Sequence, residues 1–157
     1  MKTAVVYYSI DGNCGFVAEQ IKTLLNADLV RLYTQDEKQR SGIAKFFWCL
    51  GMVFSRKMPP LKPHTFDSSA YDLIIIGAPV WAGSSAPPVH TFLSQAGIKG
   101  KRVALFVCHA GGKGSSLEKF KALLAGNDII AAADFKEPAK NDNEALKQLI
   151  ADWVRGF

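Results

Sequence analysis

Near the N-terminus, a short apolar run leads directly into residues that suit a phosphate-binding turn. Residues 4–7 are apolar, and residues 9–15 read Ser-Ile-Asp-Gly-Asn-Cys-Gly. Ser9 offers a hydroxyl, Gly12 tolerates a positive φ, and Asn13 is a favourable helix N-cap. Between a strand and a helix, unpaired backbone N–H groups and the positive end of the helix dipole attract an anion. The stretch indicates a phosphate site, although an ordinary strand-to-helix turn has the same pattern.

Two later stretches also have the features of ligand-binding loops. Residues 78–88 place a large aromatic residue, Trp81, beside small and flexible residues. Residues 108–114 include three glycines within four positions, which implies backbone that something approaches closely. Cys108 and His109 are neighbours at the end of a predicted strand and should point to opposite sides, so a Cys–His nucleophilic pair is not expected.

Apolar runs alternate with helical stripes along the chain. The second run is interrupted by Arg31, which favours an edge position, whereas the unbroken run at residues 71–77 is typical of a central strand. Helices are predicted between the runs, and Pro87 or Pro88 is expected to start the third of the major ones. The strands are expected at residues 2–8, 29–33, 71–77, 101–108 and 129–135.

Strand–helix alternation in 157 residues indicates an α/β fold, a doubly wound five-stranded parallel sheet with helices on both faces. We expect the strand order 2-1-3-4-5. In such sheets ligands bind beyond the carboxyl ends of the strands, where the winding direction reverses. The three unusual loops follow strands one, three and four and leave from that end, so we expect them to form one cleft.

The composition, 48% hydrophobic and 21% charged, suits one soluble domain spanning residues 1–157. The cysteines Cys14, Cys49 and Cys108 are few and lack metal-ligand spacing, which favours a reduced, cytoplasmic protein without a metal site. No targeting segment is apparent. The most apolar later stretch, residues 46–54, is shorter than the roughly 18 residues that a membrane span needs.

Residues 38–66 form a basic and aromatic insertion. They contain six basic and no acidic residues, so the rest of the chain has a net charge of −1 within a total of +5, and a nucleic-acid-binding role has little support. We expect Trp48 and its aromatic neighbours to cover the core, with contact to a partner or a membrane surface as the alternative. A helix is predicted at residues 41–55 from apolar residues at helical intervals: Ile43, Phe46, Phe47, Leu50 and Phe54.

These stretches resemble the flavodoxin family, and more closely its short FMN-binding members. The resemblance rests on the first loop, on Tyr71 and Asp72 before strand three, on residues 79–89 and on the glycine-rich loop, and it spans nearly the whole chain. It implies a flavodoxin-like fold, FMN as cofactor and electron transfer as function. The implied cofactor-binding residues are Ser9, Ile10, Asp11, Gly12, Asn13, Cys14, Pro79, Val80, Trp81, Ala82, Gly83, Cys108, His109, Ala110, Gly111 and Gly112.

By the same resemblance, the first loop would hold the FMN phosphate, Trp81 would flank the isoalloxazine ring, and residues 108–114 would close its other side. Asp11 and Cys14 depart from the family pattern, which has threonines there. A carboxylate in contact with a phosphate would repel it by on the order of several kcal/mol if poorly screened. We therefore expect Asp11 to turn outward while backbone amides hold the phosphate.

Two functions of different classes follow from this resemblance. The first is an electron carrier without catalytic residues of its own, which serves redox partner proteins and docks an acidic one through the basic insertion. The second is an NAD(P)H-dependent FMN reductase acting on quinones or similar small acceptors. A flavin-free interaction module is a third alternative, because of Asp11. Either a monomer or a homodimer is compatible with the sequence.

Three other classes that use related folds or loops are excluded. A receiver domain needs an aspartate at the end of strand three, where Gly77 stands, and a low-molecular-weight phosphatase needs an arginine at the position of Gln20. A Walker loop needs Ser or Thr after Lys113, where Gly114 stands.

The basic insertion also bears on the redox potential. Typical flavodoxins are acidic, which disfavours an anionic reduced ring, whereas this chain is basic. We expect a less negative potential for the fully reduced flavin if the insertion, including Arg56 and Lys57, lies near the ring.

Overall fold

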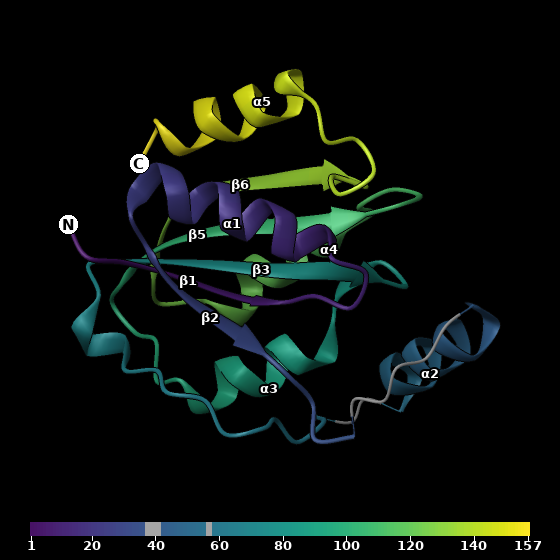
Figure 1. Ribbon diagram of the computed structural model, residues 1–157. Coiled ribbons are helices and arrows are strands. Elements are labelled where there is room, and N and C mark those ends of the chain that lie inside the picture. Colours follow the sequence, from purple (N-terminus) through teal and green to yellow (C-terminus); the bar gives the residue numbers. More distant parts are fainter. Residues whose placement is uncertain (37–41, 56–57) are drawn as a thin grey trace.

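The computed structural model describes residues 1–36, 42–55 and 58–157, and its centre is a parallel sheet (Figure 1). The spatial order β2-β1-β3-β5-β6 matches the predicted order, and the numbers differ because a short extra strand, β4, pairs with the end of β3. The α/β class and the edge position of β2 are confirmed. The strands are β1 (Thr3–Tyr8), β2 (Asp28–Leu32), β3 (Leu73–Trp81), β4 (Ser84–Ser85), β5 (Arg102–His109) and β6 (Asp128–Lys136).

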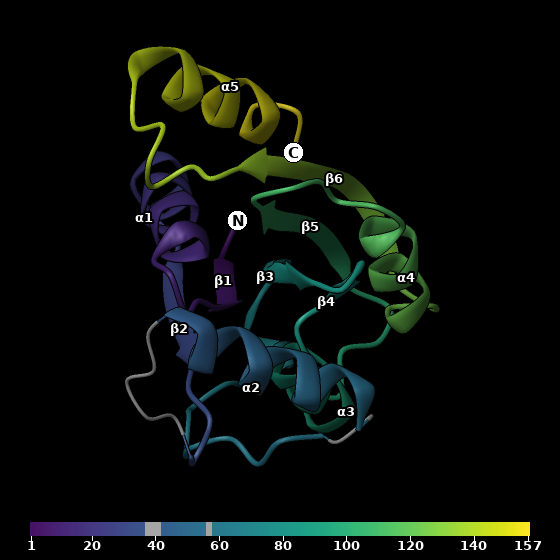
Figure 2. The same cartoon turned by 90° about the vertical axis from the view of Figure 1, so that its right-hand side faces the viewer.

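Helices lie on both faces of the sheet. In Figures 1 and 2, α1 and α5 lie on one face and α3 and α4 on the other. Two prolines occupy the first positions of α3, as predicted, where a missing N–H costs no helical hydrogen bond. Of the helices in the described residues, none is long and apolar enough to cross a membrane. The helices are α1 (Asn13–Leu25), α2 (Gly42–Phe54), the 3₁₀ turn η1 (Ser68–Ala70), α3 (Pro87–Gln95), α4 (Ser116–Leu123) and α5 (Glu144–Val154).

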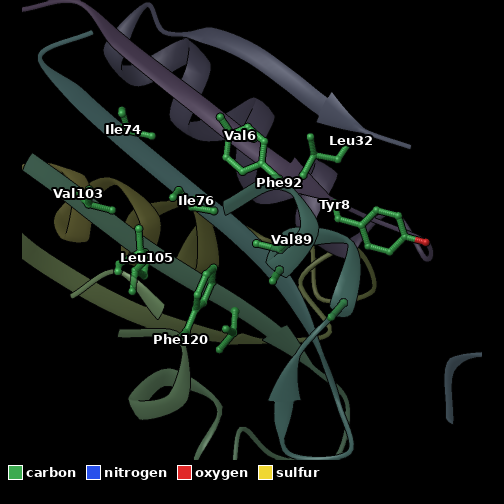
Figure 3. Close-up of a cluster of buried hydrophobic side chains, with 14 of the residues drawn as sticks. Val6, Tyr8, Leu32, Ile74, Ile76, Val89, Phe92, Val103, Leu105 and Phe120 are labelled. Atoms are coloured by element: carbon green, nitrogen blue, oxygen red, sulfur yellow. The ribbon is translucent and has the colours of Figure 1, made fainter. Parts of the chain in front are cut away.

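The strands are apolar without interruption because each face of the sheet has its own core. Val6, Ile74 and Ile76 point to the α3 and α4 side, where they pack with Phe92 and Phe120 (Figure 3). Their sequence neighbours face α1 and α5 instead, because strand side chains alternate between faces. Both layers together fix the register of the strands, and hence the positions of the loops at their carboxyl ends.

Residues 78–81, expected in a loop, instead extend β3. Pairing of β3 with β1 ends at Gly77, whereas pairing with β5 continues to Pro79, which can therefore lie in the strand despite lacking an N–H group. The chain then reverses through Ala82 and Gly83, whose φ angles are 48° and 71°. Such a two-residue turn matches the twist of a hairpin, so β4 folds back along the end of β3.

Helix α2 is where the prediction and the structure differ most. The helix itself is confirmed, but among its described residues none is buried. Phe46 and Phe47 are 60% and 65% exposed, and Trp48 lies half-buried against Trp81, so the prediction that these three residues cover the core is wrong. The helix projects beyond the carboxyl ends of the strands (Figures 1 and 2). Four basic residues of the insertion lie outside the described residues: Lys38, Arg40, Arg56 and Lys57.

Candidate functional site

The loops that follow β1, β3 and β5 meet around one cleft, as their order in the sheet predicts. The cleft consists of a cavity of about 370 Å³ and an adjoining one of about 110 Å³, which share lining residues from all three loops. Ile10 comes from the first loop, and Val80 and Trp81 come from the end of β3. His109 is the last residue of β5, and Ala110 follows it. The larger cavity is within the size range of small-molecule sites.

The structure brings the predicted residues together. In the described part of the chain, each predicted cofactor residue lines one or both cavities except Gly12. The larger cavity has in addition a wall that the sequence did not reveal, made by α2: Lys45, Phe46, Cys49 and Leu50. The helical stripe predicted α2 itself, but nothing in the stripe indicates that its residues would lie opposite loops far away in sequence.

The first loop has the geometry of an anion site at a helix start, with one correction. Gly12, at a φ of 82°, is the N-cap of α1, and the prediction that Asn13 caps this helix is wrong. The Asn13 Oδ1 accepts a hydrogen bond from the N–H of Ala139, 3.0 Å away, and so ties α1 to the segment after β6. The buried Ser9 hydroxyl accepts a hydrogen bond from the N–H of Gly15 at 3.3 Å.

Asp11 has a cationic partner. The Nζ of Lys45, from α2, contacts the Oδ1 of Asp11, and both residues line the larger cavity. The Asp11 side chain is 49% exposed, so water screens it in addition to Lys45. The pair offsets the negative charge that the first loop would otherwise present to an anion.

Two buried cysteines line the smaller cavity. Cys14 and Cys108 are 1% and 3% exposed and line the same wall. Burial, together with a hydrogen bond to Cys108, raises the pKa of the Cys14 thiol well above its usual value. Cys14 therefore adds no negative charge beside the helix start at neutral pH.

Trp81 is held by aromatic neighbours on two sides. Its ring meets Tyr8 edge-on at 5.8 Å between centroids and Trp48 of α2 at 6.0 Å. The turn that follows is fixed from α4, because the Nζ of Lys119 donates to the carbonyl of Gly83 at 3.1 Å. Trp81 lines both cavities, so its ring lies beside space in which a planar ligand could stack.

The last residue of β5 is a histidine that a carboxylate fixes in place. The Nε2 of His109 lies 3.0 Å from Asp134 of β6, whose other oxygen accepts from Lys113 at 2.6 Å. The His109 side chain is 10% exposed, and its Nδ1 is buried and meets no polar partner among the described residues. Because His109 lines both cavities, Nδ1 is an unused polar atom beside the cleft.

A further cavity lies on the other side of α2. Its volume is about 530 Å³, and it is lined mainly by α2 and by residues 58–60. In the described part of the chain, none of its lining residues belongs to the loops after β1, β3 and β5, so it is not where the fold brings those loops together.

Comparisons with known proteins agree with this fold. The family model described as Flavodoxin matches residues 2–156. The structure is similar to a flavoprotein from Lactobacillus acidophilus, crystallised in complex with FMN, at 27% identity and a TM-score of 0.73, covering 90% of this chain and 96% of that one.

Two flavodoxins share the fold at lower identity. The flavodoxin of Megasphaera elsdenii is 18% identical with a TM-score of 0.63, covering 98% of this chain and 99% of its own. Flavodoxin 2 of Bacillus cereus is 18% identical with a TM-score of 0.63, covering 99% of this chain and 97% of its own. Among curated proteins, none matches the chain in sequence. Because the family model covers nearly every residue, the chain belongs to the flavodoxin family.

Proposed function

We propose that this protein binds FMN in the cleft and carries electrons between redox partners. The observation that carries the proposal is the convergence of three loops on one cleft that has a helix start at one end and the Trp81 ring beside it. The L. acidophilus relative crystallised with FMN supports the choice of ligand.

The residues of the cleft suit the parts of FMN. A phosphate needs donors, and the first N–H groups of α1 have no partner within the helix. An isoalloxazine ring needs a flat apolar surface, and Trp81 and Val80 are half-buried beside the larger cavity. The glycine loop after β5 would bring backbone close to the ring edge, because Gly111 and Gly112 carry no side chains that would fill the cavity.

When bound, FMN supplies the redox chemistry, accepting and releasing electrons singly or in pairs. The chain's own part is to hold the phosphate at the start of α1, to fix the ring against Trp81 and to set the charge around it. The Asp11–Lys45 pair keeps that part of the cleft nearly neutral. This answers the argument for a flavin-free module, which depended on an unpaired Asp11.

A visible absorption spectrum of the purified protein, before and after incubation with FMN, tests the cofactor. Flavin absorbance that remains with the protein through gel filtration is expected, and its absence would contradict FMN binding.

Steady-state oxidation of NADPH by FMN-loaded protein, with a quinone as acceptor, tests whether the protein is an electron carrier or a reductase. We expect slow turnover, whereas fast turnover would identify an NAD(P)H-dependent reductase.

A further inference from the structure

Helix α2 exposes large apolar side chains to solvent, whereas a helix that packs on a core buries them. Residues three, four and seven positions apart share a face of a helix. On one such face lie Ile43, Phe47 and Phe54, which are 76%, 65% and 73% exposed. Phe46, at its edge, is 60% exposed. We call these four residues the α2 apolar stripe. All four are mostly exposed, although Phe46 and Phe47 also line the cavities on the two sides of the helix.

The opposite face of α2 is attached to the cleft, so the orientation of the stripe is fixed. Lys45 contacts Asp11 of the first loop, and Trp48 packs edge-on against Trp81 at 6.0 Å. Cys49 also faces inward and lines the cleft. Because these inner contacts hold the helix, rotation of α2 to bury the stripe would break them.

Basic residues outnumber acidic ones in the sequence around the stripe. From residue 38 to residue 66 the sequence contains six basic and no acidic residues. Within the described residues, Lys62 is exposed beyond the C-terminal end of α2. A helix with exposed aromatic and aliphatic side chains, flanked in the sequence by basic residues, is typical of segments that bind the surface of a membrane.

We propose that the α2 apolar stripe docks this protein on the surface of an anionic lipid bilayer. The large apolar side chains would enter the boundary between headgroups and acyl chains, and the basic residues would face anionic headgroups. A second copy of the chain fits less well, because two such insertions face to face would bring twelve positive charges together, and Asp11 offsets one of them, Lys45, in each copy.

An acidic protein partner would satisfy the charge but not the shape of the stripe. The stripe runs along a single convex helix, and a protein would need a groove complementary to it, whereas a bilayer surface adapts to it. Docking would place the cleft at the membrane, because Phe46 belongs to the stripe and also lines the larger cavity. Apolar electron acceptors dissolved in the bilayer would then lie close to the cleft opening.

The test is co-sedimentation of the FMN-treated protein with vesicles. Vesicles of phosphatidylcholine alone are compared with vesicles that contain about 30% phosphatidylglycerol. The test variant is Ile43→Ser with Phe47→Ser and Phe54→Ser. The matched control is Leu24→Ser with Leu123→Ser and Leu149→Ser, which replaces residues 48%, 47% and 56% exposed on α1, α4 and α5.

We expect wild type and control to bind the anionic vesicles, and the test variant to bind about tenfold or more weakly. Salt at about 0.5 M should weaken wild-type binding, because the basic residues are then screened. Far-UV circular dichroism checks that each variant is folded. Absence of wild-type binding, or equal binding by the test variant, would overturn the proposal.

The mass of the protein in solution, measured by light scattering, distinguishes a second copy of the chain from a protein partner as the occupant of the stripe. A wild-type dimer that the test variant abolishes, without vesicle binding, would identify a second copy as the occupant. A wild-type protein that is monomeric and does not bind vesicles would leave a protein partner as the occupant of the stripe, and would equally overturn lipid docking.

Discussion

At the scale of single residues, the ion pair of Asp11 and Lys45 joins the first loop to α2. The two side chains are 49% and 28% exposed, so solvent weakens the pair and its contribution to stability is small. Its effect on an anionic ligand is larger, because removal of Lys45 leaves a carboxylate without a partner beside the proposed phosphate site.

A mutant cycle on this pair tests that effect. We expect Lys45→Gln to weaken FMN binding by about three- to tenfold, and Asp11→Asn to leave it unchanged or slightly stronger. The double variant should regain most of the affinity that Lys45→Gln loses. Quenching of FMN fluorescence measures all four dissociation constants. Equal losses in the single and double Lys45 variants would instead assign Lys45 a direct contact with FMN.

The carboxyl of Asp134 has a lowered pKa. Burial alone would raise its pKa, but hydrogen bonds from Lys113 and His109 outweigh burial and hold the pKa below its usual value. The folded-state pKa is therefore below the unfolded value of about 4. Ionised Asp134 stabilises the fold above that pH, and this stabilisation is lost as the pH falls through the folded-state pKa.

We expect Asp134→Asn to lower the free energy of unfolding at pH 7 by at most about 1 kcal/mol, because Lys113 is well exposed. The difference from wild type should shrink below about pH 4. Urea unfolding at pH 7 and at about pH 3.5 measures it. A difference that is the same at both pH values would mean that the effect of the substitution is packing and not charge.

At the scale of elements, the β3–β4 hairpin positions Trp81 and is fastened to α3. The Nε2 of His90, in the first turn of α3, lies 2.8 Å from the hydroxyl of Ser85 in β4. Burial lowers the pKa of His90, and the hydrogen bond to Ser85 opposes this only in part. His90 is therefore neutral at pH 7, and the fold loses stability as the pH falls below the unfolded value of about 6.5.

Replacement of His90 tests this fastening. Wild type should lose more thermal stability between pH 7.5 and pH 5.5, values on either side of about 6.5, than His90→Gln, which does not titrate there. Ser85→Ala is the matched control: it keeps the histidine and its pH dependence, and lowers stability at pH 7 by about 1 kcal/mol. Identical pH dependence in wild type and His90→Gln would show that other groups cause it.

At the scale of the whole molecule, the packing of the sheet leaves no room for an additional carbon atom at one glycine. Gly77 of β3 lies against Phe106 of β5, which is fully buried and meets Phe135 and Trp153 edge-on. A Cβ on Gly77 would lie 2.1 Å from the Phe106 ring. Phe135 and Trp153 pack against the ring, and close packing of a buried core limits how far it can move.

We expect Gly77→Ala to lower the free energy of unfolding by about 1–3 kcal/mol or more. Gly51→Ala, in α2, is the control: a Cβ there meets nothing within 4 Å, and alanine favours a helix by roughly 0.5–1 kcal/mol. Urea denaturation measures both. Unchanged stability in Gly77→Ala would mean that β3 and β5 can separate at this point.

The sequence predicts the sheet and the three loops because each depends on local patterns. Continuous apolar runs predict the buried strands, and the order of the strands brings the loops together at one end. The N-cap at Gly12 is not predictable in the same way, because the Asn13 side chain is used by Ala139, which is 126 positions away. The extension of β3 through Pro79 likewise depends on how far β1 and β5 pair with it.

The orientation of α2 is the feature that the sequence pattern predicts least well. An apolar stripe identifies a helix and the face that prefers to leave water, but it does not say whether protein or another surface covers that face. Here the contacts of Lys45 and Trp48 decide the orientation, and their partners lie far away in the sequence, in the first loop and at the end of β3.

The account depends most directly on FMN binding against Trp81, and a fluorescence titration of FMN tests it. Wild type should bind one FMN per chain, Trp81→Ala should bind about tenfold or more weakly, and Phe54→Ala, exposed on α2, should match wild type. Failure of the wild type to take up FMN, or equal affinity in Trp81→Ala, would contradict the proposed site.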